Sequence, residues 1–294
     1  LGQLYAKLLV QRDWVHLVGQ YHLNGKQIFD LDDNIVSMLR NTDVTDCTLH
    51  DWHPPYDALF VRFGKQDDMK LPFDDGHEYL DGAFVAVTPW TDEGTERRLK
   101  FGLTTVKDDG SGVMMPGYFI DFIPAEQRLS PHEAVKAFIA RKCAELDSDP
   151  DKSEQVQALN EVRKGELREG AALLAKATEL IVNCLFYIES MAIDNELLPG
   201  RDVPADLLVK WQQTPPLRRF KVAQKINSDG YAMVRMMGDQ VQPGDGLGSR
   251  DRSDVSTHWR RGHWRHQVHG PQNSLKKRIW IRPVMVNPSR PHED

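Results

Sequence analysis

The sequence predicts an α+β protein, and three observations support this prediction. Four short apolar runs between positions 56 and 123 follow one another without an intervening helical pattern, which favours a four-stranded antiparallel sheet. Residues 166–192 carry an apolar stripe at three- and four-residue intervals, which predicts a long core helix. Near the C-terminus, a basic segment rich in Trp, Arg and His shows strand-like alternation and predicts a separate β-rich module.

The four apolar runs have the length and composition of strands. Aliphatic and aromatic residues dominate them, and the third run alternates cleanly between apolar and polar positions. The turn sequence Asp-Asp-Gly occurs at 74–76 and again at 108–110, between successive runs. Strands that follow one another in this way tend to pair with their sequence neighbours, so we expect an antiparallel meander. The predicted strands are 56–63, 82–87, 98–103 and 118–123.

Helical patterns lie on both sides of these strands. The best local signal is at Ser130, which can cap free backbone N–H groups, with Pro131 suited to the first turn and Glu133 at capping-box spacing. A helix from there to about position 146 follows. A short helix near 203–211 is stopped by two consecutive prolines. The complete set of predicted helices is 4–18, 28–39 (a weaker pattern), 131–146, 166–192 and 203–211.

Composition is that of a soluble globular chain. Of its 294 residues, 40% are hydrophobic and 27% are charged. Three widely separated cysteines without a C-x-x-C pair favour free thiols in a reducing cytoplasm over a disulfide framework. No signal-peptide pattern is visible, and the most apolar run, 180–193, is shorter than the roughly 20 residues that span a bilayer. We therefore expect a cytoplasmic protein without a membrane partner; the sequence does not indicate its oligomeric state.

Charge is divided unevenly along the chain. Residues 1–249 carry a net −12, residues 250–290 carry +8, and the last four residues carry −2. A Gly-, Asp-, Gln- and Ser-rich stretch separates the two parts. We therefore expect an acidic α+β body over 1–237, a linker or long loop over 238–256, and a basic module over 257–290. Such a module either binds an anionic partner or docks onto the acidic body.

Candidate binding residues gather in the basic module. Guanidinium groups pair with phosphates and indoles stack on unpaired bases, so the module suits nucleic-acid binding. Trp and Arg also anchor peptides. In a third interpretation, the two tryptophans Trp264 and Trp280 form a core with arginines stacked on them. Alternation places Arg278, Trp280 and Arg282 on one strand face. The candidate residues are Arg260, Arg261, His263, Trp264, Arg265, Arg278, Trp280 and Arg282.

Metal and catalytic sites find little support. Histidines at 258, 263, 266 and 269 match no closed zinc pattern, and no cysteine is near them. Paired aspartates at 32–33, 74–75 and 108–109 lie beside turn residues, and the glycines of 244–248 lack the context of a phosphate loop. No Ser/His/Asp or Cys/His arrangement is visible. We therefore predict no enzyme activity and no cofactor.

The C-terminal residues resemble a family of mobile-element proteins that includes a type V-A anti-CRISPR, which acts on biosynthesis of the RNA-guided effector nuclease. The match is specific at Arg260-Arg261-Gly262-His263-Trp264, then at Gly270, Arg278, Pro283 and Val286-Asn287. Weaker similarity covers 73–76, 82–87 and the helix after Ser130. The sequence departs from the family pattern between Trp264 and Gly270 and through much of the helical middle.

The resemblance implies a mechanism without catalysis by this chain. The protein would recognise the nascent N-terminal peptide of a target nuclease during translation and cause loss of its mRNA. An acidic, aromatic-bearing body suits a basic peptide, and the basic module suits RNA or the ribosome. A rival hypothesis is a nucleic-acid-binding regulator encoded by a phage or plasmid. A second rival is a metal-dependent nuclease that uses His263 and nearby carboxylates.

Overall fold

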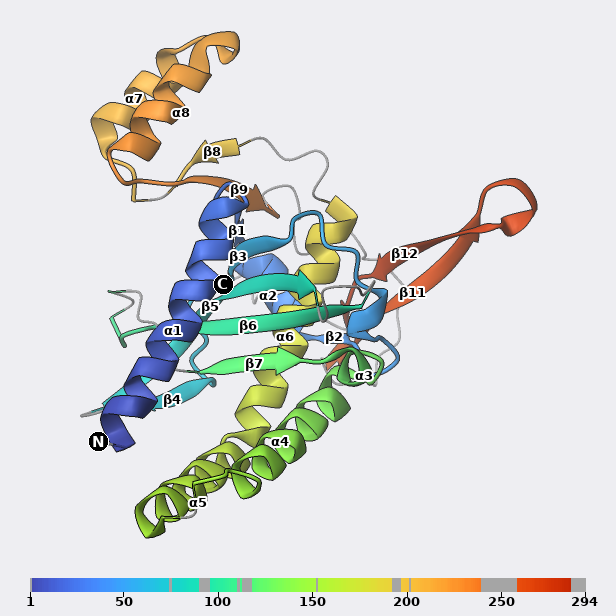
Figure 1. Ribbon diagram of the computed structural model, residues 1–294. Helices are drawn as coiled ribbons and strands as arrows, with labels where there is room; N and C mark the ends of the chain where they lie inside the picture. Colours follow the sequence, from blue (N-terminus) through green and yellow to red (C-terminus); the bar gives the residue numbers. More distant parts are fainter. Residues whose placement is uncertain are drawn as a thin grey trace, which may run out of the picture.

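A mixed eight-stranded sheet organises the chain in the computed structural model (Figure 1). The structure describes residues 2–73, 76–89, 96–109, 112, 118–151, 153–191, 197–200, 202–238 and 258–286. The strand order is β7-β6-β5-β3-β1-β9-β8, and β4 pairs with β5 off this path. The strands are β1 (Ile28–Leu31), β3 (Ala58–Arg62), β4 (Lys70–Phe73), β5 (Gly76–Pro89), β6 (Arg97–Val106), β7 (Phe119–Phe122), β8 (Leu197–Pro199) and β9 (Met233–Met237).

The predicted four-stranded sheet is only part of this larger sheet. Strands β3, β5, β6 and β7 form the expected antiparallel meander. The total of four was wrong, because β1 adds in parallel to β3 and to β9 on its other side. Buried strands of four or five residues show no alternation of apolar and polar residues, so their sequence does not identify them as strands. The α+β class is confirmed, and the sheet is wider and of mixed direction.

The helix predicted over 28–39 was wrong in its first third. Residues Ile28–Leu31 form β1, and helix α2 (Asp33–Arg40) begins only after it. Asp32 is the N-cap: its backbone is extended, and its carboxylate accepts a hydrogen bond from the Asn34 backbone N–H at 2.9 Å. The capping aspartate lies directly between the strand and the helix. Because no loop separates the two elements, their apolar residues together resemble the spacing of a single helix.

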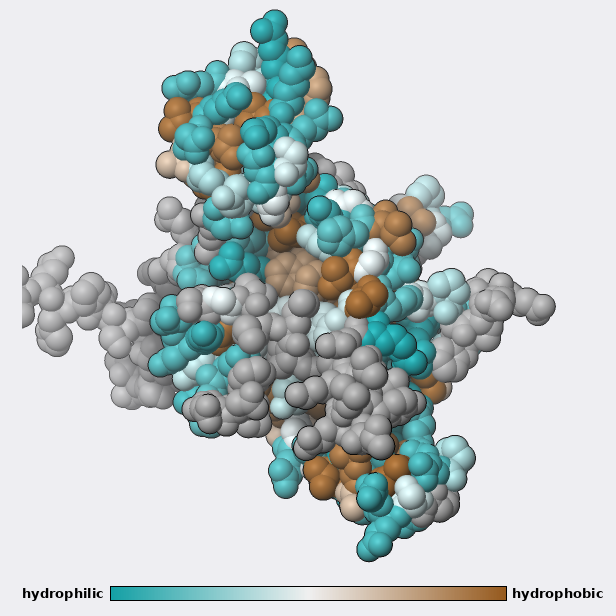
Figure 2. Space-filling model, turned by 60° about the vertical axis from the view of Figure 1, so that its left-hand side comes forward, coloured by the Kyte–Doolittle hydropathy of each residue, from teal (hydrophilic) through white to brown (hydrophobic). Residues whose placement is uncertain are grey.

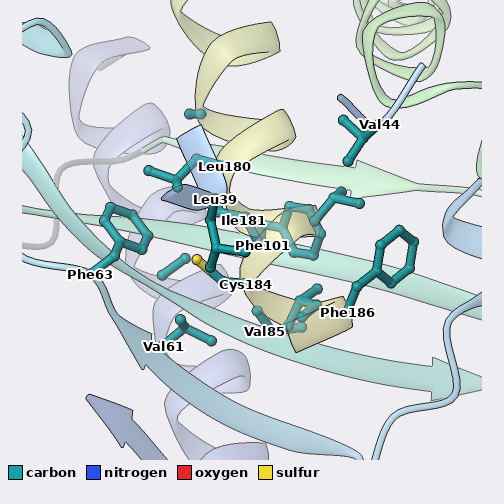
Figure 3. Close-up of a cluster of buried hydrophobic side chains, with 14 of the residues drawn as sticks. Leu39, Val44, Val61, Phe63, Val85, Phe101, Leu180, Ile181, Cys184 and Phe186 are labelled. Carbon is teal, nitrogen blue, oxygen red and sulfur yellow. The ribbon is translucent and has the colours of Figure 1, made fainter. Parts of the chain in front are cut away.

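Helices cover both faces of the sheet (Figure 1). Helix α1 (Gly2–Leu23), which contains the predicted 4–18 helix, packs Trp14, Leu17 and Tyr21 against one face. The opposite face holds the main core, where α2, α4 (Pro131–Asp147) and α6 (Ala171–Met191) pack on β3, β5 and β6. Figure 3 shows Cys184 and Phe186 of α6 directed into the same cluster as Val61 and Val85 from the strands.

The long core helix predicted over 166–192 is confirmed over most of its length as α6, and only residues 166–169 belong to the preceding helix, α5 (Glu154–Glu169). Helix α5 ends at Gly170, and α6 starts at Ala171. The Gly170 N–H closes the last turn of α5 on the Glu166 carbonyl, and its own carbonyl accepts from Leu174 in α6. Helix α6 has the length and hydropathy of a membrane span, but most of it is buried inside the protein, as in a core helix. Ser130 and Glu133 form the predicted capping box of α4.

A small helical unit stands apart from the body. The predicted helix at 203–211 is confirmed as α7 (Ala205–Gln213). It is followed by η2 (Pro216–Arg218) and α8 (Arg219–Ser228), and the unit has its own apolar cluster. Figure 2 shows it as a lobe above the body with apolar residues among polar ones on its surface; Leu217 and Phe220 are exposed.

The cysteines are free, as predicted. Cys47 and Cys184 are buried and Cys143 is half-buried. Burial raises the pKa of the Cys47 thiol to about 11, so this group stays protonated and unreactive near neutral pH. The predicted linker 238–256 lies, except for Gly238, outside the described residues. The remaining short elements are α3 (Pro124–Gln127), η1 (Leu49–Asp51), β2 (Thr42–Asp43), β10 (His258–Arg260), β11 (Gly262–His269), η3 (Pro271–Asn273), β12 (Leu275–Ile281) and β13 (Val284–Val286).

Candidate binding surface of the C-terminal module

The C-terminal module is a β-hairpin attached at one end to the body. Strands β11 and β12 pair antiparallel over their whole length, and Gly270 and η3 connect them. At its base β11 also pairs in parallel with β2, while β10 pairs with β13. Figure 1 shows the far end of the hairpin extending away from the sheet into open space. The structure thus confirms the β-rich module and shows a base in contact with the body and an exposed tip.

The two tryptophans hold the base of the hairpin on helix α6. Trp264 and Trp280 are directly opposite across the two strands, and their rings stack with centroids 5.9 Å apart. Trp264 is 6% exposed, and its indole N–H donates to Asn183 Oδ1 at 2.8 Å. The Trp280 N–H donates to Thr42 Oγ1 at 3.0 Å. Both polar indole atoms are therefore satisfied inside the protein, which is what burial of this side chain requires.

Arg278 is also engaged with the body. Its side chain is 8% exposed, and Nη1 lies 2.7 Å from Glu189 Oε2. Nη2 donates to the Asp51 carbonyl at 2.8 Å, and the guanidinium carbon lies 3.7 Å from the ring centre of Phe186. A planar guanidinium can make these stacking and hydrogen-bonding contacts at once, which a lysine cannot. Arg278 neutralises Glu189 and attaches β12 to α6.

These contacts favour the structural interpretation of Trp264 and Trp280. The two rings pack on each other, and one arginine, Arg282, lies over Trp280 with its guanidinium carbon 5.9 Å from the ring centroid. The core is shared with the body, because Trp264 belongs to the main apolar cluster. The predicted strand face also holds, since Arg278 and Trp280 both face α6.

The remaining candidate residues face solvent. Within the described chain, residues 258–286 contain seven Lys and Arg and no Asp or Glu. His263 and Arg265 lie on the hairpin face opposite the tryptophans, beside Ile281 and Ile279 of β12. The exposed predicted residues are Arg260, Arg261, His263, Arg265 and Arg282, and the tip adds His266, His269, Lys276 and Lys277.

Asp43 in β2 is an acidic neighbour of this basic surface. Its carboxylate accepts from the Thr45 backbone N–H and hydroxyl, both at 2.8 Å. The backbone hydrogen bond from Thr45 is the main cause that lowers the Asp43 pKa; partial burial opposes it, and the Thr45 hydroxyl and the charges of Arg261 and His263 add to it. Asp43 therefore remains a carboxylate beside the positive residues of β11.

Sequence reasoning missed the body side of this attachment. Asn183, Thr42 and Glu189 bind the hairpin, and none was a candidate. A signal was present: Asn183 and Glu189 are the polar residues that interrupt the apolar run 180–193. A polar side chain in an apolar core helix needs a partner elsewhere in the fold. Among the described residues, no group of three His, Cys, Asp or Glu side chains is arranged to hold a metal ion.

A protein-family model matches the sequence along most of the chain. The model is described as "AcrVA2-like: Anti-CRISPR type V subtype A2 family", and it matches residues 29–288. The chain belongs to this anti-CRISPR family. The match begins in β1 and continues beyond β13, so it includes the sheet, α6 and the hairpin. The resemblance seen in the sequence is thereby confirmed.

Two further comparisons accompany the family match. A solved structure entitled "Crystal structure of AcrVA2" is similar to this chain at 15% sequence identity, with a TM-score of 0.44. The aligned part covers 92% of this chain and 75% of that one. A comparison with curated proteins finds no match.

Proposed function

We propose that this chain is an anti-defence protein that recognises the nascent N-terminal peptide of a target nuclease and lowers the level of that nuclease and its mRNA. Membership of the anti-CRISPR type V subtype A2 family is the observation that supports this proposal most directly. The peptide is the element that distinguishes the target from other translated proteins. The chain acts in the cytoplasm, where translation takes place, and a host nuclease degrades the message.

The charge distribution fits two binding events. Residues 258–286 carry +7, so the rest of the chain carries −13 when the total is −6. The acidic body suits a basic peptide, and the exposed basic residues suit RNA or the ribosome. In this proposal Arg260, Arg261, His263, Arg265 and Arg282 form the contact surface. Trp264, Arg278 and Trp280 position that surface through their contacts with the body.

The proposal is tested in cells with an active type V-A system. We expect the native chain to lower effector protein and effector mRNA together. The Arg260→Ala/Arg261→Ala variant should restore both, because it removes two exposed cations without touching the buried base. A matched control, Arg218→Ala/Lys221→Ala, removes two exposed cations from the α7–α8 unit and should silence like the native chain. Unchanged effector levels with the native chain contradict the proposal.

The rival function, a nucleic-acid-binding regulator, is favoured by the acid-free basic hairpin. The two functions differ in what they read. If the protein recognises the peptide, synonymous recoding of the first effector codons should not change silencing, and a frameshift that changes the encoded peptide should abolish it. If the protein recognises the nucleic acid, synonymous recoding should weaken silencing, and a frameshift that leaves most of the nucleotide sequence unchanged should not. Effector mRNA measured for both recoded genes separates the two functions.

A further inference from the structure

The tip of the β11–β12 hairpin combines exposure with unbalanced positive charge. All side chains from Arg265 to His269 are exposed, as are those from Leu275 to Lys277. Val268 and Leu275 are 47% and 52% exposed, so no described part of the protein covers the strands fully here. Figure 1 shows this part of the hairpin extending away from the other helices and strands.

The positive charges at the tip form no ion pairs within the described part of the protein. At the base, Arg278 is neutralised by Glu189 and covered by Phe186. At the tip, no described acidic group forms an ion pair with Arg265, Lys276 or Lys277, and no Asp or Glu occurs anywhere in 258–286. Like charges on a narrow two-stranded ribbon repel one another, which destabilises it. Such a ribbon is stabilised when an anionic partner binds.

The aromatic groups of the hairpin determine the kind of partner. Binding of single-stranded nucleic acid uses exposed aromatic rings on which bases stack. The described indoles of this hairpin stack on each other at the base and donate their N–H groups to Asn183 and Thr42. The tip therefore offers cations, short apolar side chains and the small rings of His266 and His269, and among its described residues it has no indole or phenyl ring on which bases could stack. This set of groups suits the regularly spaced phosphates of a double helix, which is recognised by shape and backbone contacts.

We propose that the tip of the β11–β12 hairpin binds the phosphate backbone of double-helical RNA without sequence specificity. The choice of RNA over DNA rests on the proposed function, in which the chain acts during translation. Arg265, Lys276 and Lys277 make the phosphate contacts. The hairpin thereby holds the protein close to structured RNA while another part of the molecule recognises the peptide.

The test measures binding of the full chain to a fluorescent RNA duplex of mixed sequence at several salt concentrations. The duplex spans about 16 base pairs, enough to present successive grooves. The tip variant is Arg265→Gln/Lys276→Gln/Lys277→Gln. The control, Lys210→Gln/Arg218→Gln/Lys221→Gln, makes the same change in net charge on exposed positions of α7, η2 and α8. Near-ultraviolet circular dichroism of the stacked tryptophans confirms folding, and the single charge reversal Lys276→Glu serves as a second, smaller change.

The native chain should bind more weakly as salt rises, with log K falling about 0.9 per phosphate contact against log salt on a duplex. The tip variant should lose about 10-fold or more in affinity at low salt and reduce this slope by roughly 2 to 3. The control should bind like the native chain. Equal losses in the two triple variants would overturn the proposal.

Two further arms identify the partner. A DNA duplex of the same sequence that binds more tightly than RNA overturns the RNA assignment and favours the regulator. A poly-glutamate peptide that binds in a tip-dependent way, while RNA does not bind, makes the tip a site for acidic protein. Silencing in cells is scored separately with Lys276→Gln/Lys277→Gln, which leaves the contact surface of the proposed function unchanged. If this variant loses RNA binding but still silences, the proposed function stands and the tip does not hold the protein on RNA during silencing.

Discussion

Asn183 connects the core helix to β2 with one hydrogen bond and to the hairpin with another. Its amide N–H donates to the Thr42 carbonyl at 3.1 Å, and its amide oxygen accepts from the Trp264 indole at 2.8 Å. The side chain is buried among apolar residues of α6. Buried polar groups contribute little while paired and cost much more when a partner is lost. Asn183 therefore specifies where the hairpin sits more than it adds to stability.

Replacement of Asn183 by leucine should destabilise the protein strongly. Asn183→Leu leaves the Trp264 N–H and the Thr42 carbonyl without these partners, and each unsatisfied buried group costs about 1 to 3 kcal/mol. We expect a loss of roughly 2 to 4 kcal/mol in the free energy of unfolding, measured by urea denaturation. Thr178→Val on the same helix serves as a control, because the Thr178 hydroxyl has no hydrogen-bond partner among the residues that the structure describes.

A double-mutant cycle isolates the indole bond. Trp264→Phe removes the donor and keeps an aromatic ring. Because Asn183 and Trp264 share one hydrogen bond, the double variant should be less destabilised than the sum of the two single variants, by about 0.5 kcal/mol or more. Strict additivity would show that the bond is absent in solution.

At the scale of elements, a glycine allows the hairpin to meet the body closely. Gly262 starts β11, and its N–H donates to the Asn41 carbonyl at 2.9 Å. A Cβ at this position would lie 2.7 Å from Pro283 Cδ and 2.8 Å from the Ile281 carbonyl oxygen. Much of what surrounds this position is backbone, which cannot rotate away. Gly262 lies within the segment whose sequence resembles the family, and its role here is one of close packing.

Gly262→Ala should shift the base of the hairpin and loosen the tryptophan stack. Overpacking of this kind costs about 1 to 3 kcal/mol. We expect a lower thermal midpoint and a weaker near-ultraviolet circular dichroism signal from Trp264 and Trp280. Gly165→Ala is the control: its Cβ would meet nothing within 4 Å, and alanine inside helix α5 should stabilise by about 0.5 to 1 kcal/mol. An unchanged tryptophan signal in Gly262→Ala would contradict the packing argument.

Elements with a local chemical signal could be predicted from the sequence. The capping box at Ser130 and the meander of long apolar strands depend on residues close in sequence. The strands β1 and β9 could not be predicted, because they are stabilised by pairing between segments some 200 positions apart, as in Phe29 with Arg235. The division at Gly170 was hidden because the apolar stripe continues from α5 into α6.

For the candidate surface, too, only part could be predicted from the sequence. Its residues could be named from composition, but their roles depend on tertiary contacts. Arg278 and Arg282 are equally basic in the sequence, yet one is buried against Glu189 and Phe186 while the other is exposed. Alternation along the strand does not separate them, because positions 278 and 282 lie on the same face. Arg278 lies inside β12 beside Glu189 of α6, whereas Arg282 lies just beyond the end of β12.

At the scale of the whole molecule, an acidic body carries a basic hairpin, and the two meet at β2. The pairing of β2 with β11 places Asp43 opposite His263, next to the exposed basic surface. Most positive charge of the hairpin remains free for a partner, while Asp43 and Glu189 provide opposite charge at the base. Attachment of the module therefore has an electrostatic component that depends on pH.

Asp43→Asn tests how much the charge of Asp43 contributes to stability. The Asp43 pKa is lowered in the folded state, chiefly by the Thr45 backbone hydrogen bond, so its charge stabilises the fold above the unfolded pKa of about 3.9. That stabilisation disappears as pH falls through the lower, folded pKa. Urea unfolding should show the variant less stable than the native chain at pH 7, by about 1 kcal/mol or less because the site is partly exposed to solvent.

The difference between the two proteins should vanish on acidification, when both carry a neutral side chain at position 43. The asparagine oxygen can still accept from Thr45, so the comparison isolates the charge rather than the hydrogen bond. Asp46→Asn, at an exposed position three residues away, is the matched control and should change stability little at either pH. If the gap for Asp43→Asn were as large at pH 2 as at pH 7, its origin would be steric, and the charge of Asp43 would contribute nothing to stability.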